Sequence, residues 1–205
     1  WYATVQHGLD ARLYPFNDRP TGDYLAFLGR ISPEKRPDRA IAIASRAGLP
    51  LKIAAKVDAA DKSYFEHQIR PLLDNPLVEF IGEIGDAEKA AFLGGARALL
   101  FPIDWPEPFG LVMIEAMACG TPVIAWRCGS VPEVVDDGVT GLIVQSEAEA
   151  VDAVRRIDQL DRRTVRAVFE RRFSSATMAR AYLREYRRLL GDRRPPGDSP
   201  LRKAA

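Results

Sequence analysis

The sequence of 205 residues contains little cysteine, little histidine and no long hydrophobic run. Its two cysteines, Cys119 and Cys128, lack metal-ligand spacing and cannot form a disulfide framework, so we expect a reducing, cytoplasmic setting. The apolar runs are short and interrupted by charge, and we expect neither a membrane span nor a signal peptide. The formal net charge of +1 argues against a nucleic-acid-binding protein that acts through a strongly basic face.

Several common signatures of cofactor and metal sites are also absent from the sequence. It has no Gly-x-Gly-x-x-Gly stretch, no phosphate-binding P-loop and no Asp-x-Asp pair to hold a divalent metal. It has only two histidines, His7 and His67, which are too few and too far apart in the sequence to indicate a histidine-based catalytic site or a zinc site. We therefore predict no metal site and no dinucleotide cofactor, and we interpret His7 as a turn residue.

Short apolar runs alternate with amphipathic stretches along most of the chain. The runs predict strands at residues 24–28, 51–57, 78–81, 98–101, 122–125 and 142–144. Helices are predicted between them at residues 37–47, 61–73, 86–96, 110–119 and 131–135, and then consecutively at 147–159, 162–171 and 174–190. This alternation indicates an α/β fold, a doubly wound and Rossmann-like parallel sheet with extra C-terminal helices.

The first stretch with chemical potential is GRISPEKRP at residues 29–37, between a predicted strand and a helix. We expect Gly29 to let the backbone turn sharply there. Arg30 and Lys35 then place two cations near a helix N-terminus at the carboxyl edge of the sheet, where an anion binds naturally. The alternative is a solvated loop in which Arg30 pairs with Glu34.

The second stretch is EPFGLVMIE at residues 107–115, where Glu107 follows a proline-rich loop. Glu115 lies inside an apolar helix, and an unpaired buried charge would cost several kcal/mol. It must therefore face a cavity, a cation or hydroxyl donors, and a sugar diol fits because a carboxylate can accept two hydroxyl protons. Amides around Phe109, Gly110 and Leu111 open the helix and can meet phosphate or sugar oxygens. The alternative places Glu115 on a solvent-facing stripe.

Two further loops give weaker signals. Gly82 and Gly85 bracket a loop whose backbone can reach a planar base, although a plain strand-to-helix turn that is capped by Asp86 is the favoured interpretation. In CGSVPE at residues 128–133, Ser130 and Glu133 have the spacing of a helix capping box. Capping is a sufficient explanation for this second loop.

Taken in chain order, these stretches resemble the C-terminal half of a family 4 glycosyltransferase with the GT-B fold. The resemblance rests on FLGRISPEK (27–35), VEFIG (78–82), EPFGLVMIEA (107–116), MACGTPVI (117–124), and GSVPE (129–133) through Gly141 and Leu142. The family usually has glycine where Arg36 stands. VQHGLD at residues 5–10 resembles the interdomain hinge of the family, from which Gln6 and His7 depart.

The resemblance implies a division of the chain and of the enzyme. Residues 1–22 would be the remnant of an interdomain hinge, residues 23–190 the nucleotide-sugar-binding domain, and residues 191–205, rich in proline and basic residues, a disordered tail. Because the chain opens at Trp1, we expect a fragment whose N-terminal acceptor domain is absent. The intact protein would then be a retaining, metal-independent hexosyltransferase, and this fragment alone would be inactive or nearly so.

The resemblance also assigns roles to individual residues. Arg30 and Lys35 would contact the donor diphosphate, Glu107 the hexose, and Glu115 the ribose hydroxyls. The first three form the predicted catalytic set, and the predicted donor-binding residues are Gly29, Ile84, Phe109, Gly110, Leu111, Val112 and Glu115. The expected donor is a UDP-hexose, with no cofactor and no metal.

The same resemblance suggests partners and leaves alternatives open. The N-terminal domain of the same protein is the expected partner, nucleic acid is not, and the intact enzyme is expected to contact a membrane surface. An exposed apolar hinge and a C-terminal helix with Tyr182 and Tyr186 would also favour a homodimer. The alternatives are a non-enzymatic module that binds nucleotides or glycans, and an epimerase or hydrolase of the GT-B fold.

Overall fold

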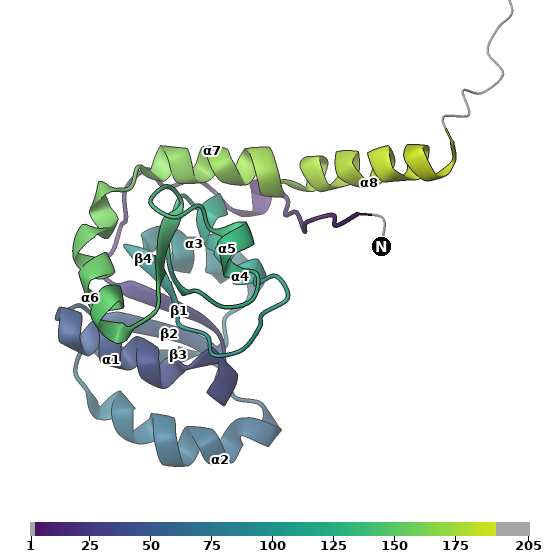
Figure 1. The fold of residues 1–205 in the computed structure, drawn as a ribbon. Coiled ribbons are helices and arrows are strands. Elements are labelled where there is room, and N and C mark those ends of the chain that lie inside the picture. The colour runs from purple at the N-terminus through teal and green to yellow at the C-terminus, as the bar shows by residue number, and fades with distance from the viewer. Residues whose placement is uncertain (1–2, 192–205) are drawn as a thin grey trace, which may run out of the picture.

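Six parallel strands form one sheet in the order β3-β2-β1-β4-β5-β6. These features come from a computed structural model, which describes residues 3–191 (Figure 1). The strand order reverses direction between β1 and β4, as in a doubly wound sheet, so the predicted fold class is confirmed. The strands are β1 (Leu25–Arg30), β2 (Leu51–Lys56), β3 (Val78–Gly82), β4 (Ala98–Phe101), β5 (Val123–Trp126) and β6 (Gly141–Val144).

Helices cover both faces of the sheet because alternate strand residues point to opposite sides. In β1, Leu25 and Phe27 belong to one apolar core, and Ala26 and Leu28 to the other. The first core contains α1 (Pro37–Ala47) and α6 (Glu147–Arg156), and the second contains α3 (Asp86–Gly95), α4 (Leu111–Ala118) and α7 (Arg162–Phe173). The shorter α2 (Lys62–Tyr64) and α5 (Val131–Val134) and the long α8 (Ser175–Leu189) complete the set.

The helix predicted at residues 61–73 is more irregular than expected. The structure has the single α-turn α2, then a π-helical turn at Phe65–Ile69, then a 3-10 segment at Arg70–Asp74. Pro71 explains the change, because proline has no N–H to donate and clashes with the preceding turn of an α-helix.

The C-terminal helix α8 extends away from the sheet in line with α7 (Figure 1). It has no buried residue, and Tyr182 and Tyr186 are 44% and 55% exposed. The exposed apolar surface predicted near Tyr186 is therefore confirmed. Trp1 and Tyr2 lie outside the described residues, as do residues 192–205 of the tail predicted at residues 191–205. None of the described helices is both long and apolar enough to cross a membrane.

The segment before β1 lies against the helical layer of the domain. The amide of Leu9 donates to the carbonyl of Phe173 at 2.9 Å, and the amide of Ser175 donates to the carbonyl of Leu9 at 2.8 Å. Arg166 of α7 donates to the carbonyl of Tyr14 at 2.8 Å. Residues of the stretch predicted as a hinge remnant are thus held by α7 and by the start of α8.

Candidate functional site

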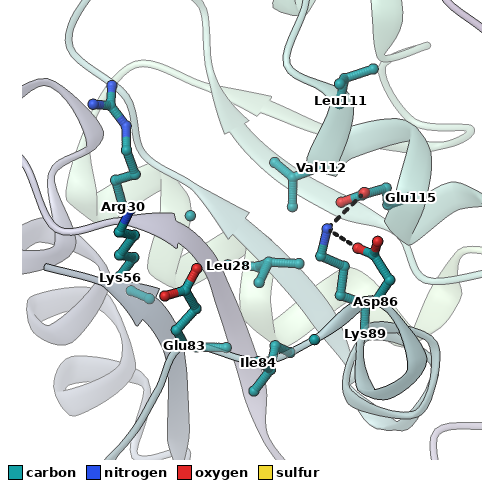
Figure 2. Close-up of a pocket in the computed structure, with 14 residues that line it drawn as sticks. Leu28, Arg30, Lys56, Glu83, Ile84, Asp86, Lys89, Leu111, Val112 and Glu115 are labelled. Atoms are coloured by element: carbon teal, nitrogen blue, oxygen red, sulfur yellow. Dashed lines mark ion pairs between the residues drawn. The ribbon is translucent and has the colours of Figure 1, made fainter. Parts of the chain in front are cut away.

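Two adjoining pockets lie at the carboxyl edge of the sheet, at the point where strand order reverses. The larger, of about 510 Å³, is bounded by the ends of β1 and β2, the loop before α3, and the first turns of α4 (Figure 2). The smaller, of about 230 Å³, lies between β1, the end of β4 and the start of α4. They share a wall made of Leu28, Gly29, Arg30, Leu111 and Val112, and we call the two together the cleft. Open α/β sheets bind ligands at this position.

Gly29 serves the cleft differently from what the sequence predicted. The strand does not turn there: Gly29 pairs with Ala55, and β1 continues to Arg30. A Cβ at Gly29 would meet nothing within 4 Å, because this residue faces the open cleft. The glycine therefore keeps the floor of the cleft empty, and the predicted sharp turn is wrong.

Arg30 and Lys35 both line the smaller pocket, and both have acidic partners. Arg30 approaches Glu34 at 3.4 Å and Asp58 at 3.6 Å, so the pairing with Glu34 that the sequence left open is present. The Arg30 side chain is 51% exposed, and exposed pairs of this kind contribute little. Its guanidinium therefore stays free to turn toward a ligand.

Lys35 forms the tighter contact, with the carboxylate of Glu107. Only 17% of the Lys35 side chain and 13% of the Glu107 side chain is exposed. The indole N–H of Trp105 donates to the same carboxylate oxygen, Oε2, at 2.9 Å. The structure thus brings together two residues that the sequence placed 72 positions apart in separate loops.

Glu115 lies at the other end of the cleft and does not belong to a solvent-facing stripe. It is 8% exposed and lines the larger pocket. The hydroxyl of Tyr14 donates to its Oε1 at 2.9 Å, and the ammonium of Lys89 approaches the same oxygen at 3.5 Å. Figure 2 shows Lys89 between Glu115 and Asp86, which it contacts at 2.9 Å. Cavity, cation and hydroxyl donor are therefore all present around this carboxylate.

The pKa values of Tyr14 and Lys89, which both contact Glu115, lie above their ordinary values. Burial and the negative charge of Glu115 raise the pKa of Tyr14 well above its ordinary value. Burial acts to lower the pKa of Lys89, but Asp86 and Glu115 outweigh it and the pKa ends above its ordinary value. At neutral pH both side chains are therefore proton donors toward the Glu115 carboxylate.

The loop that carries Glu107 is held in place by Gly129 and Ser130. The Ser130 amide donates to the carbonyl of Glu107 at 2.9 Å, and its hydroxyl donates to the carbonyl of Phe109 at 2.9 Å. A Cβ at Gly129, whose φ is +54°, would lie 2.4 Å from the Glu107 nitrogen. The predicted capping box with Glu133 is wrong, since the Ser130 side chain makes no cap hydrogen bond and holds this loop instead.

The N-terminus of α4 meets both pockets. Gly110 has a φ of +77°, which lies outside the α-helical region, so the helix begins at Leu111. A Cβ at Gly110 would also lie 2.7 Å from Met113 Cε. Gly110, Leu111 and Val112 line the smaller pocket, as the predicted set requires. Phe109 does not line either pocket: its ring packs edge-on against His7 at 4.9 Å and against Phe173 at 6.1 Å.

The loop before α3 closes the far wall of the larger pocket. Ile84 and Gly85 line it, as does Asp86. Gly85, and not Asp86, is the residue that caps α3, and its amide donates to Glu88 Oε2 at 2.9 Å. Asp86 is instead the first helical residue and pairs with Lys89, so the predicted capping role is wrong.

Several residues that line or support the cleft carry no signal in the sequence. Tyr14 and Lys89 contact Glu115, but neither belongs to a motif that the sequence singled out. Lys56 and Glu83 also line the larger pocket, and Trp105 supports Glu107. Within residues 3–191, no group of three or more histidine, cysteine or acidic side chains is arranged to hold a metal ion.

Comparison with known proteins identifies the family. Residues 15–169 match the family described as "Glycosyl transferases group 1". The chain belongs to this family. The resemblance drawn from the motifs is therefore confirmed, and the chain is a glycosyltransferase domain.

Individual relatives agree with this assignment. D-inositol 3-phosphate glycosyltransferase of Mycobacterium leprae is 33% identical over 193 residues, which cover 83% of this chain and 43% of that protein. A glycosyltransferase involved in avilamycin A biosynthesis is 30% identical with a TM-score of 0.79, covering 91% of this chain and 57% of that one. Anabaena HepE, crystallised with UDP and glucose, shares the fold at 21% identity and a TM-score of 0.76, over 87% and 55% of the two chains. The chain thus spans about half the length of these proteins.

Proposed function

We propose that this glycosyltransferase domain binds the nucleoside diphosphate sugar donor of a retaining, metal-independent hexosyltransferase. One observation carries the proposal: a single cleft at the switch point has a buried carboxylate at one end and two basic side chains beside a helix N-terminus at the other. In a nucleoside diphosphate sugar the ribose hydroxyls are followed by the phosphates, so the hydroxyls would match the carboxylate end of the cleft and the phosphates the basic end. The complex of Anabaena HepE with UDP and glucose supports UDP-hexose as the donor class.

The donor would lie along the cleft with its ribose at Glu115. The carboxylate can accept hydroxyl protons, and Ile84 and Gly85 line the same pocket, where the base would lie. The empty space at Gly29 would admit the diphosphate close to the backbone. The hexose would then reach Glu107 in the smaller pocket.

The cleft can stabilise a departing diphosphate with its own groups. Negative charge grows on the diphosphate as the glycosidic C–O bond breaks. An ammonium has three donors, so Lys35 can keep Glu107 as a partner and still donate to phosphate oxygens. Arg30 adds to this stabilisation, and so does the N-terminus of α4, which acts as about half a positive unit charge. Glu107 would orient the hexose and not act as the nucleophile.

The other half of the reaction site would come from an N-terminal domain of the same protein. We expect the chain alone to bind nucleotides weakly and to transfer sugar poorly, because an acceptor that is not held beside the donor loses most of the rate advantage of proximity. The exposed apolar face of α8, with Tyr182 and Tyr186, is a surface that such a domain could cover.

Isothermal titration calorimetry with UDP, GDP, ADP and their sugars tests the proposal. We expect Arg30→Ala and Lys35→Ala each to weaken UDP binding about tenfold, which corresponds to about 1.4 kcal/mol, and to leave uridine binding unchanged. Arg46→Ala is the matched control, because Arg46 is an equally exposed arginine that pairs with Glu147 away from the cleft. Equal losses for UDP and uridine would contradict the assigned roles, and no binding of any nucleotide sugar would remove the donor assignment.

A further inference from the structure

Tyr14 belongs to the segment before β1, yet its side chain contacts a residue that lines the cleft. The residue is buried, with 7% exposure, and its hydroxyl donates to Glu115 Oε1 at 2.9 Å. The two residues are 101 positions apart in the sequence. A buried hydroxyl that points at a buried carboxylate is a costly arrangement unless each satisfies the other.

The backbone around Tyr14 is fixed as firmly as its side chain. Arg166 of α7 donates to the carbonyl of Tyr14 at 2.8 Å. Three residues further on, the amide of Asn17 donates to the carbonyl of Cys119 at 3.1 Å, just after α4 ends. The hydroxyl is therefore held at a set distance from α4, the helix that carries Glu115.

Tyr14 and Lys89 approach the same oxygen of Glu115, Oε1. The second oxygen, Oε2, is therefore the one available to a ligand in the larger pocket. A hydrogen bond fixes the carboxylate in one orientation, whereas an ammonium at 3.5 Å attracts it without defining an angle. The direction of Oε2 thus depends chiefly on the Tyr14 hydroxyl.

We infer that Tyr14 is a positioning residue of the cleft, which holds Glu115 so that one carboxylate oxygen faces the ribose of the donor. This inference rests on the proposed function. It makes the segment before β1 part of donor recognition, although that segment contributes no residue to the wall of either pocket.

The predicted consequence is a loss of selectivity for ribose over deoxyribose. A buried carboxylate in a fixed orientation rejects a sugar that lacks a hydroxyl, because the acceptor is then left unpaired. Without the Tyr14 hydroxyl, the Glu115 side chain can turn toward Lys89 and no longer meets the ribose in one geometry. The penalty for the missing hydroxyl then falls.

The test compares UDP with 2′-deoxy-UDP by calorimetry for the wild-type chain and for Tyr14→Phe. We expect Tyr14→Phe to weaken UDP binding about fivefold to tenfold and to change 2′-deoxy-UDP binding less than twofold. Tyr24→Phe is the matched control, since its hydroxyl donates to the carbonyl of Phe92 at 2.6 Å and the residue lines neither pocket. A Tyr14→Phe variant that keeps the wild-type preference for UDP would overturn the inference while leaving donor binding intact.

A double-mutant cycle separates positioning from a general loss of structure. In a Glu115→Gln background, Tyr14→Phe should have no further effect on the ratio of UDP to 2′-deoxy-UDP affinity, because the Tyr14 effect passes through Glu115. The same ratio change in both backgrounds would mean that Tyr14 acts by another route, and the inference would be wrong. If the wild-type chain bound neither nucleotide, the proposed function itself would fail.

Discussion

Glu107→Gln should strengthen binding of UDP while weakening binding of UDP-hexose. In the resting structure the Glu107 carboxylate contacts the Lys35 ammonium, so a diphosphate at this end of the cleft must share that cation with a carboxylate. Glutamine removes the negative charge and keeps a side-chain oxygen that can accept the Trp105 N–H. The phosphate then has Lys35 to itself, but the sugar loses an ionised acceptor for its hydroxyls.

The size of the gain follows from the charge that is removed. A phosphate bound on the far side of Lys35 would lie about 6 Å from Glu107, and two unit charges at that distance repel by about 0.7 kcal/mol in water and about 2.8 kcal/mol at an effective dielectric constant of about 20. Glu107 is only 13% exposed but the cleft is open, so we expect the gain in the free energy of UDP binding to lie in the lower half of this range. UDP should then bind about threefold to tenfold more tightly.

Calorimetry at one ionic strength measures both ligands on the wild-type chain and on the variant. Glu147→Gln is the control, because Glu147 also pairs with a basic residue, Arg46, but lies outside the cleft. The gain for UDP should shrink as salt is added, since screening weakens the repulsion that the variant removes. UDP binding that is unchanged or weaker in Glu107→Gln would refute the idea that the resting ion pair competes with the diphosphate.

Two further predictions concern the supports of the site. Arg162→Met should lower the free energy of unfolding, measured by urea titration, by at least about 3 kcal/mol. Arg162 is buried and donates to the backbone carbonyls of Asn17, Gly94 and Ala96, which the variant would leave without that donor. Arg163→Met is the control, and it should change the free energy of unfolding little because Arg163 is exposed. Tyr14 has a raised pKa in the folded state, so its contribution to stability is complete below about pH 10 and is lost as the pH rises further. The stability difference between wild type and Tyr14→Phe should therefore be constant from about pH 7 to pH 9 and decrease above pH 10, and a difference that grows with pH would contradict this account.

Much of the fold could be predicted from local pattern. Each apolar run became a strand, and in β4 all four residues are buried, as expected for a parallel strand that is covered on both faces. Each amphipathic stretch between runs became a helical segment. The errors arise where one residue type has several uses. Gly29 signals freedom of the backbone, but the sequence does not say whether that freedom makes a turn or leaves space beside a ligand. Pro71 interrupts its helix in a way that spacing alone did not reveal.

The site was predictable only where its residues are close in sequence. Glu115 stands out because a carboxylate inside an apolar helix needs partners, and Arg30 and Lys35 stand out because they lie at and beyond the carboxyl end of a strand. The partners themselves could not be named. Tyr14 reaches Glu115 because the segment before β1 packs across α4 and α7, and this packing leaves no periodic trace in the sequence.

Pairing of the charges in the cleft explains how a neutral resting site can select a charged donor. Lys35 pairs with Glu107, Lys89 pairs with Glu115, and Arg30 pairs with acidic residues at the rim, so each end of the cleft holds a cation and an anion together. A bare phosphate must share Lys35 with the Glu107 carboxylate, and the two negative groups repel each other in a site so little exposed. Under the proposed function, a nucleoside diphosphate hexose offsets this repulsion: its phosphates accept from Lys35, and its hexose hydroxyls donate to the Glu107 carboxylate. The ion pair at this end thus favours the complete donor over its product, which is the selectivity that Glu107→Gln is expected to reverse.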